Sequence, residues 1–549
     1  MKSFRLRLML TLLVLTLVAA TISAHAQTFS VLYNFGTTTG DPATPYFSGV
    51  IAQGRDGKLY STTDFGGDNG GLQDGAMFSI APSGALTVPY SFPLPFEEPV
   101  SGLTLGIDGN FYGTTTQGGG GFGTVFKITP TGTLTVLHTF TDSDGSTPFA
   151  PPIQGTDGNF YGATTYGGAN SLGAIYKITP GGIFTSLYSF DSTHGANPFG
   201  QLVQGTDGNF YGTASAGGPN PSLGVVYKIT PAGRLTVIYN FDVTHGYQPL
   251  GPLVQGSDGS FYGTTNGGGT IGNGVIFKIT STGTLTVLHN VNAATDGSTT
   301  YGALVQATDG NFYGTASSDT TTGYGTIFKI SPISPYTYSV VYHFDYTTGG
   351  VPYAGLVQHT NGILYGDTNI GGTGTLWCNS CGTFYSLNIG AAPFLSLVST
   401  SGKVGNTIEI LGQGFTGTTG VSFNGKAATF KVWSRTYLTA TVPSGATTGF
   451  ISVVTPGGTL KSNKQFRVRP QIASFTPSSG PVGTSVIITG VSLTQTTRVI
   501  FGSVRATTFT VNSDTQATAT VPTGAVTGKI TIATAGGNVT SATSFTVTP

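Results

Sequence analysis

Five carboxylates near the start of the chain fall outside any regular pattern and are the residues best suited to chemistry. They are Asp64, Asp68, Asp74, Glu97 and Glu98. Two such carboxylates can serve as acid and base on a glycosidic bond, and several carboxylate oxygens on one or two loops can hold calcium. No spacing here matches a known signature for either site. These carboxylates are therefore compatible with hydrolase or lyase chemistry and with a bound calcium ion, but no residue among them is assigned as catalytic.

Other polar loop residues extend this group of candidates for ligand binding. They are Asn69, Tyr166, His194, His245 and Asp367. Loop residues that a rigid scaffold holds in place commonly form binding sites. The alternative is that each of them is an ordinary solvated loop residue.

The two histidines of this group occupy the same position in a repeated connector. Both lie in the sequence D-x-T-H-G, which covers residues 191–195 and 242–246. Two imidazoles can share a metal ion. Copies of a repeat explain the pair more simply, so the metal content is left open.

The chain has two cysteines, Cys378 and Cys381, separated by two residues. This spacing imitates a thioredoxin-type redox motif. Redox sites, however, place the first thiol at the N-terminus of a helix, whereas this pair lies between two expected strands. In an exported chain a structural disulfide is therefore favoured, and two ligands are too few for a structural zinc site.

These residues are distributed over a repeat that fills the first two-thirds of the chain. Each unit carries Asp-Gly or Asn-Gly, then any residue, then Leu or Phe, then Tyr. The anchors are 49 to 52 residues apart and lie at Asp56, Asp108, Asp157, Asp207, Asp258, Asp309 and Asn361. Repeats of this length are typical of propeller blades.

Each unit has four short strand signals separated by turn residues. In the third unit the expected strands cover residues 152–155, 160–165, 174–179 and 183–190. Asp157 and Gly158 suit a tight hairpin because both residue types tolerate positive φ. A Pro-Gly-Gly turn closes the next hairpin. Four antiparallel strands in each unit are typical of one blade.

The ends of the repeat region indicate a closed ring. The last unit, residues 356–387, has three strand signals, while residues 29–35 form a strand signal that precedes the first unit. The N-terminal strand is therefore expected to complete the last blade and leave no open sheet edge. The predicted fold class is all-β, with a seven-bladed β-propeller over residues 27–390.

Strand direction assigns the turns and the longer loops to opposite faces of this propeller. The Asp-Gly and Pro-x-Gly turns share one face, and the Gly-rich loops and the connectors between units share the other. The loop face is the predicted binding face, because it carries the candidate residues above. It also carries Asn170, Asn220, Asn266 and Asp319.

The turn aspartates are predicted to be structural and to pair with lysines of the third strand. Those lysines are Lys127, Lys177, Lys228, Lys278 and Lys329. In the last unit Asn361 and Ser386 replace the two charged residues together. Exposed ion pairs contribute about 0–1 kcal/mol each, so their role would be to fix the hairpin register.

Two similar modules follow the repeats, at residues 391–469 and 470–549. Both contain V-G-x-x-x-x-I-x-G, then A-T-V-P, and end with F-x-V. On these motifs they resemble IPT/TIG immunoglobulin-like domains. The resemblance implies that each forms a small β-sandwich that acts as a spacer or an interaction module.

The repeats in turn resemble the bacterial GloVer tandem-repeat family. The residues that carry the resemblance are D-G-N-F-Y-G-T-T at 108–115 and G-T-V-F-K-I-T-P at 123–130. No activity is attached to that family. The resemblance implies an exported protein that is often displayed on the cell surface.

The N-terminus has the pattern of an export signal. Lys2, Arg5 and Arg7 precede an apolar run over residues 8–20, and Ala-His-Ala at 24–26 offers a cleavage site. Residues 1–26 are therefore predicted to be a signal peptide. Charged residues make up 8% of the 549 residues and balance to zero. That composition argues against nucleic-acid binding, and no other segment is apolar and long enough for membrane insertion.

The sequence favours an exported or cell-surface binding or adhesion protein that is not an enzyme. We expect a monomer that binds an extracellular glycan or a surface protein and needs no cofactor, with a bound calcium ion left open. A secreted polysaccharide-active hydrolase or lyase that uses the first-repeat carboxylates is the alternative. A purely structural surface-layer component is the third hypothesis.

Overall fold

A computed structural model describes residues 27–45, 50–68, 75–93, 97–298, 300–374 and 380–549. The predicted signal peptide and three predicted site residues, Asn69, Asp74 and Cys378, lie outside these ranges. The described residues are all-β and contain no helix, as expected. Among them, no helix is long and apolar enough to cross a membrane.

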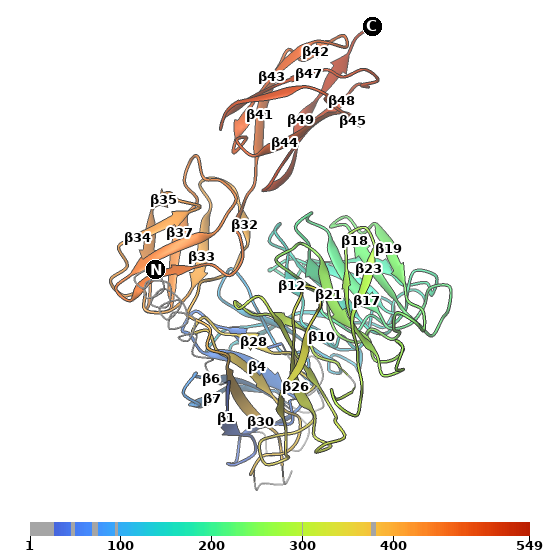
Figure 1. The fold of residues 1–549 in the computed structure, drawn as a ribbon, viewed down its shortest axis with the longest axis vertical. Helices are drawn as coiled ribbons and strands as arrows, with labels where there is room; N and C mark the ends of the chain where they lie inside the picture. The colour runs from blue at the N-terminus through green and yellow to red at the C-terminus, as the bar shows by residue number, and fades with distance from the viewer. Residues whose placement is uncertain (1–26, 46–49, 69–74, 94–96, 299, 375–379) are drawn as a thin grey trace, which may run out of the picture.

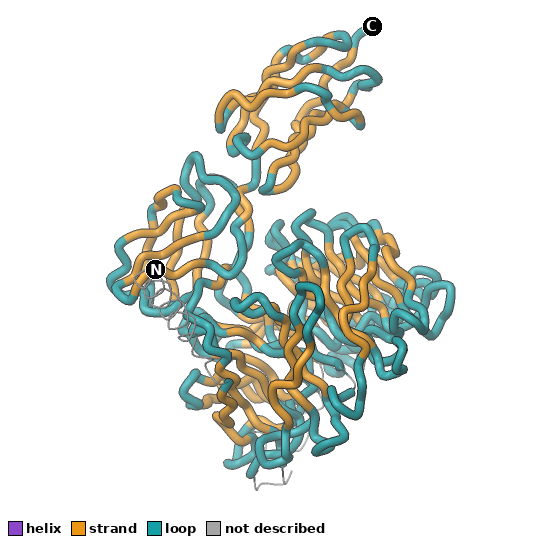
Figure 2. The backbone as a smooth tube through the Cα atoms, in the orientation of Figure 1, coloured by secondary structure: helices purple, strands orange, loops and turns teal. Residues whose placement is uncertain are grey.

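The described part of the repeat region forms seven four-stranded antiparallel sheets, which we number blades 1 to 7 (Figures 1 and 2). Blade 1 contains β3 (Ala52–Gln53), β4 (Leu59–Thr63), β6 (Ala76–Ile80) and β7 (Leu86–Ser91). Blade 2 contains β8 (Thr104–Leu105), β9 (Phe111–Thr115), β10 (Thr124–Ile128) and β11 (Leu134–Thr139). Blade 3 contains β12 (Ile153–Gln154), β13 (Phe160–Thr164), β14 (Ala174–Ile178) and β15 (Phe184–Ser189). Blade 4 contains β16 (Val203–Gln204), β17 (Phe210–Ala214), β18 (Val225–Ile229) and β19 (Leu235–Asn240). Blade 5 contains β20 (Val254–Gln255), β21 (Phe261–Thr264), β22 (Val275–Ile279) and β23 (Leu285–Asn290). Blade 6 contains β24 (Val305–Gln306), β25 (Phe312–Ala316), β26 (Thr326–Ile330) and β27 (Tyr338–His343). A small extra sheet pairs β2 (Pro42–Ala43) with β5 (Phe65–Gly66).

Blade 7 is completed by the N-terminal strand, as the sequence predicts. It contains β28 (Val357–Gln358), β29 (Leu364–Asp367), β30 (Thr383–Asn388) and β1 (Thr28–Asn34). Strand β1 pairs antiparallel with β30, from Thr28 opposite Asn388 to Asn34 opposite Thr383. The first strand of the repeat region is thereby fixed to the last repeat, and β30 has no unpaired edge on this side.

The second strand of each blade is buried on both faces because it lies between two neighbouring blades. Strand β13 is buried throughout, whereas the outer strand β15 contains only partly buried and exposed residues. In blades 1 to 5 the tyrosine of the second strand stacks on a phenylalanine of the next blade. Centroid distances are 4.3 Å for Tyr60–Phe111, 3.7 Å for Tyr112–Phe160, 4.0 Å for Tyr161–Phe210, 4.0 Å for Tyr211–Phe261 and 4.1 Å for Tyr262–Phe312.

Glutamines of the first strands also link the blades. The Gln204 side chain accepts a hydrogen bond from the Thr156 amide at 3.0 Å, and its own amide donates to the Gly208 carbonyl at 3.0 Å. The same bond joins blade 7 to blade 1, where the Thr360 amide donates to Gln53 at 3.0 Å. Contacts thus run from blade 1 to blade 7 and back to blade 1, which is a propeller-like arrangement.

Two small β-sandwiches follow, as expected for immunoglobulin-like modules. The first contains β31 (Ser396–Leu397), β33 (Thr407–Leu411), β37 (Tyr437–Thr441) and β36 (Phe430–Val432); β35 (Lys426–Ala428), β34 (Gly420–Phe423), β38 (Ile451–Thr455) and β39 (Gly458–Lys461); β32 (Ser401–Gly402) and β40 (Arg467–Val468). The second contains β41 (Gln471–Thr476), β43 (Ser485–Val491), β47 (Gln516–Thr520) and β46 (Phe509–Ser513); β42 (Ser479–Gly480), β49 (Gly537–Val547), β48 (Gly528–Thr534), β44 (Thr496–Phe501) and β45 (Val504–Arg505). Each has its own core of buried apolar residues.

The first sandwich packs against the Asp-Gly turns of the blades. The Arg55 guanidinium pairs with the Glu409 carboxylate at 2.5 Å. Thr436 donates to the Arg55 carbonyl at 2.8 Å, and Gln413 donates to the Thr360 hydroxyl at 2.8 Å. Because neighbouring strands are antiparallel, the connectors and Gly-rich loops leave at the opposite ends of the strands. The sandwich therefore occupies the turn face, and the loop face lies on the other side.

Candidate functional site

The turn aspartates bind tyrosines, and the predicted repeat of Asp–Lys ion pairs is wrong. Among the described residues only Lys278 and Asp258 form such a pair, at 2.7 Å. Instead, the tyrosine four residues after each turn aspartate donates its hydroxyl to that carboxylate. The distances are 2.8 Å for Tyr60–Asp56, Tyr112–Asp108, Tyr161–Asp157, Tyr211–Asp207 and Tyr313–Asp309, and 2.9 Å for Tyr262–Asp258.

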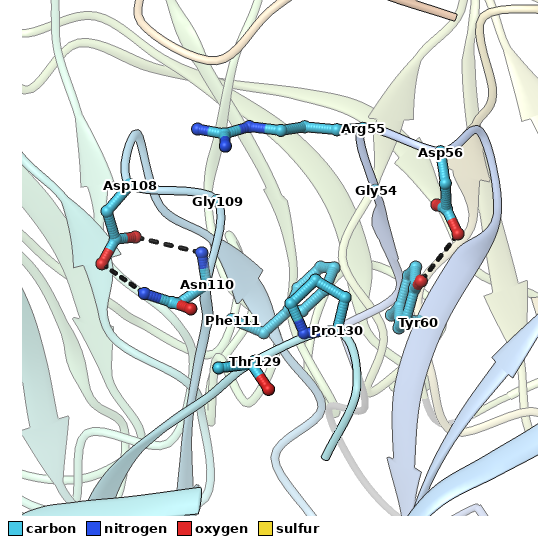
Figure 3. Close-up of a pocket in the computed structure, with 10 residues that line it drawn as sticks. All are labelled: Gly54, Arg55, Asp56, Tyr60, Asp108, Gly109, Asn110, Phe111, Thr129 and Pro130. Carbon is cyan, nitrogen blue, oxygen red and sulfur yellow. Dashed lines mark hydrogen bonds between the residues drawn. The ribbon is translucent and has the colours of Figure 1, made fainter. Parts of the chain in front are cut away.

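A cavity of about 370 Å³ lies between the turns of blades 1 and 2 (Figure 3). Figure 3 shows the bonds of Asp56 to Tyr60 and of Asp108 to Asn110 on its two sides, with Arg55 extending between the turns. The Arg55 guanidinium donates to the Ile107 carbonyl at 2.8 Å and binds the first sandwich as described above. The groups of this cavity are thus used in structural contacts, and the turn aspartates leave the set of catalytic candidates.

Two of the first-repeat carboxylates, Asp64 and Glu98, lie close enough to interact. The Asp64 side chain is 9% exposed, and one of its oxygens has no hydrogen-bond partner among the described residues. Burial, with a smaller contribution from the Glu98 charge, raises the pKa of Asp64 to about 7. Glu98 accepts hydrogen bonds from Thr116 at 2.9 Å and Gln117 at 2.8 Å. Burial also raises the pKa of the adjacent Glu97.

The other predicted loop residues differ in exposure. Asp68 is exposed, and its backbone amide donates to the Ser91 hydroxyl at 2.9 Å. Tyr166 is exposed in the Gly-rich loop of blade 3. Asp367, at the end of β29, is only 1% exposed, and burial raises its pKa to about 7. Its carboxylate in turn contributes to the raised pKa of Tyr385, so this aspartate belongs to the interior of blade 7.

Each of the two predicted histidines is paired within its own connector. His194 binds Asp191 at 2.8 Å, and His245 binds Asp242 at 2.8 Å. Similar pairs join His138 to Asp144 at 3.0 Å, His289 to Asp296 at 2.7 Å and His343 to Asp319 at 2.8 Å. Four of these pairs stabilise connectors, and the pair of His343 and Asp319 joins the end of β27 to the Gly-rich loop of blade 6. In the described ranges no group of three or more His, Cys, Asp or Glu side chains could hold a metal ion.

The structure adds a set of residues that the sequence analysis missed, at one position of the connectors. They are Phe149, Phe199, Leu250, Tyr301 and Tyr353, and all are partly exposed. The rings of Phe149 and Phe199 stack with centroids 4.4 Å apart and an interplanar angle of 9°. Those of Tyr301 and Tyr353 lie 5.2 Å apart, edge to face. We call these five residues the connector platform.

The local backbone explains how the platform is presented. In four of the five connectors the residue two positions before the platform residue has left-handed φ, and a proline follows it; φ is 54° at Thr147, 55° at Asn197, 52° at Gln248 and 52° at Val351. This conformation is costly for a residue other than glycine. The Thr147 carbonyl accepts the Thr165 amide at 3.2 Å, and the Asn197 carbonyl accepts the Ser215 amide at 3.1 Å. Each connector is thus fixed to the end of a second strand. The signal in the sequence was the large apolar residue that recurs after the connector proline.

The fold and site together define a repeat protein of propeller-like blades with an aromatic loop face and two immunoglobulin-like modules. The model of the Gloeobacter/Verrucomicrobia repeat matches residues 18–222 and 200–429, and the model of the IPT/TIG domain matches residues 393–468 and 470–547. The chain therefore belongs to the Gloeobacter/Verrucomicrobia repeat family and carries two IPT/TIG domains, which confirms both resemblances.

Solved structures with partial similarity include proteins of different activities. The surface glycan-binding protein PbSGBP-B from Prevotella bryantii is 19% identical over 28% of this chain and 41% of its own, with a TM-score of 0.22. This chain thus aligns with less than half of that protein. A fungal alcohol oxidase of the AA5 family, in complex with copper, is 14% identical over 81% of this chain and 100% of its own, with a TM-score of 0.46. No curated protein matches the chain.

Proposed function

We propose that this protein is an exported, non-catalytic glycan-binding protein whose ligand site is the loop face of a seven-bladed propeller. The propeller would cover residues 27–390, with IPT/TIG modules at 391–469 and 470–549 as spacers or interaction modules. The protein would act outside the cytoplasm as a monomer, after removal of residues 1–26.

The observation that carries this proposal is the connector platform. Five large side chains from successive connectors stay partly exposed, and four of them form two ring pairs, Phe149 with Phe199 and Tyr301 with Tyr353. Aromatic rings offer large, rigid contact areas at low entropic cost, and the apolar faces of sugar rings can pack on them. Two polar residues of the predicted site, Asp64 and Glu98, belong to loops of the same face and could form hydrogen bonds with sugar hydroxyls. The first sandwich occupies the opposite face, so it does not compete for this surface.

Glycan-array binding followed by calorimetry on the strongest glycan tests the proposal. We expect Phe199→Ala and Tyr301→Ala each to weaken binding about tenfold, which corresponds to about 1.4 kcal/mol. Trp433→Ala is the matched control, because Trp433 is a 56% exposed aromatic residue on the first sandwich. Binding that survives both connector variants but is lost with Trp433→Ala would move the site to the IPT/TIG module.

A polysaccharide-active hydrolase or lyase is the second candidate. The pKa of Asp64, raised to about 7 beside Glu98, favours it, because a general acid must keep its proton near neutral pH. Product analysis on the polysaccharides that bind would decide between the two functions. Product formation that Asp64→Asn abolishes would replace the non-catalytic proposal. Loss of binding after removal of calcium would support the predicted calcium ion in either case.

A further inference from the structure

A second cavity lies on the turn face, where the first sandwich covers the first strands of the blades. Its volume is about 390 Å³, within the range of about 300–1,000 Å³ that is usual for small-molecule sites. The propeller side is formed by first-strand residues of blades 3 to 6, among them Val203 and Val254. The sandwich side is formed by residues 398–400, Lys464 and Arg467.

The charged groups that line this cavity are all positive. Lys464 and Arg467 face it, and no Asp or Glu belongs to its lining. Lys464 belongs to the lining and is exposed, and it forms no ion pair with any described carboxylate. Arg467 donates one hydrogen bond, to the Thr206 carbonyl, and is within electrostatic reach of Asp207 and Arg469. Burial lowers the pKa of Arg467, which is partly buried.

The uncharged part of the lining offers little that could balance these charges. The glutamine side chains of the first strands are already used to link the blades, as Gln204 is to Thr156 and Gly208. The Gln201 side-chain amide donates hydrogen bonds to the Thr104 hydroxyl at 3.1 Å and to the Pro151 carbonyl at 3.0 Å. The remaining wall mixes apolar residues such as Leu202 and Val254 with polar residues such as Thr156 and Ser399. Two cations beside such a wall fit a ligand with a negative head and a compact body that has polar and apolar parts.

We propose that this cavity binds a small organic carboxylate, which the Lys464 ammonium holds as its ion-pair partner. Pairing would supply the counter-charge that the lining of the cavity lacks. The site is separate from the connector platform, so platform variants should leave it intact. Its chemistry fits an acidic sugar such as a uronic acid or a simple aliphatic carboxylate, and the test separates the two.

Calorimetry of the full chain with glucuronate, butyrate, glucose and inorganic phosphate tests the proposal. We expect at least one carboxylate to bind, glucose not to bind at this cavity, and Lys464→Gln to weaken carboxylate binding at least tenfold. Lys403→Gln is the control, because Lys403 is an exposed lysine on the same sandwich. Tighter binding of glucuronate than of butyrate would assign an acidic sugar, and the reverse order would assign an aliphatic carboxylate.

A second measurement covers the outcome in which Lys464→Gln disturbs the packing of the sandwich. After reductive methylation of the lysines, the dimethyl-lysine NMR signal that Lys464→Gln removes should shift when the carboxylate is added. The Lys403 signal should not move. Equal binding of inorganic phosphate, unchanged affinity in Lys464→Gln, or a Lys464 signal that does not respond would each overturn the proposal.

Discussion

Strand β1 should stabilise the repeat region as strongly as the outer strand of any other blade. The other outer strands follow their third strand directly in the chain, whereas β1 is held to blade 7 only by strand pairing and packing. Phe35, just after β1, is 0% exposed and packs against Tyr33 and Phe78 at centroid distances of 5.9 and 5.4 Å. Loss of a buried phenylalanine side chain typically costs about 3–5 kcal/mol. That is a large part of the roughly 5–15 kcal/mol that stabilises a typical domain. We expect Phe35→Ala to lower the free energy of unfolding by about 3–5 kcal/mol.

Phe190 supplies a matched control inside the continuous chain. It follows β15 of blade 3 as Phe35 follows β1, is also 0% exposed, and lies 5.5 Å from Tyr188 and 5.3 Å from Tyr227. Urea unfolding monitored by circular dichroism should give similar losses for Phe35→Ala and Phe190→Ala. Hydrogen exchange should rise in β30 and β29 for the first variant and in blade 3 for the second.

A deletion extends the same test. Removal of residues 27–36 leaves β30 with an unpaired edge, whereas the two sandwiches have their own cores. The deletion should therefore destabilise the blades more than removal of both sandwiches does. The reasoning fails if Phe35→Ala costs less than about 1 kcal/mol while Phe190→Ala costs about 3–5 kcal/mol, or if the deletion leaves the unfolding of the blades unchanged.

Three further predictions concern the paired and buried groups. Asp207→Ala should destabilise blade 4 by about 1–3 kcal/mol, since it removes the acceptor of a tyrosine hydroxyl, while Lys228→Ala should change stability by less than about 0.5 kcal/mol; equal losses in urea unfolding would restore the ion-pair hypothesis. Asp64 has a folded pKa of about 7, above its ordinary value, so its contribution favours folding at low pH and is lost as pH rises toward 7; Asp64→Asn should raise the unfolding midpoint at pH 8 and leave it unchanged at pH 4. Cys378 and Cys381 are predicted to form a disulfide, and titration of the unfolded, unreduced protein with a thiol reagent should find no free thiol.

Turn chemistry made the blades predictable, but the choice of partner for the turn aspartates was missed. Each aspartate and its tyrosine lie in the same hairpin, so the Asp-Gly-x-x-Tyr spacing already contained the correct pairing. The lysine lies one strand further from the turn, directly opposite the tyrosine, as Lys228 lies opposite Tyr211. The lysine is therefore about 4.8 Å further from the carboxylate, which is the spacing between neighbouring strands. The tyrosine hydroxyl is closer and forms the hydrogen bond.

The candidate site was predicted only at the level of the face that carries it. The alternation of turns and loops assigned Asp64 and Glu98 to the loop face, but their proximity depends on how two connectors pack. Asp367 was expected on a loop and is instead buried at the end of β29. A single substitution in a repeat, Asp where other blades mostly have Thr, does not show from the sequence which way the side chain will face.

The strands and turns of this protein follow from its sequence alone, because they depend on residues close together in the chain. The period of the Asp-Gly anchors, the strand missing from the last unit and the two IPT/TIG motifs were sufficient to define the blades, the pairing of β1 with β30 and the two sandwiches. Which surfaces meet, in contrast, follows from the packing of the whole chain. Phe149 and Phe199 stack across a separation of 50 residues, and Lys464 reaches a cavity that exists only because the first sandwich docks on the turn face. Such contacts depend on how neighbouring blades and domains pack, and no local pattern in the chain encodes that packing.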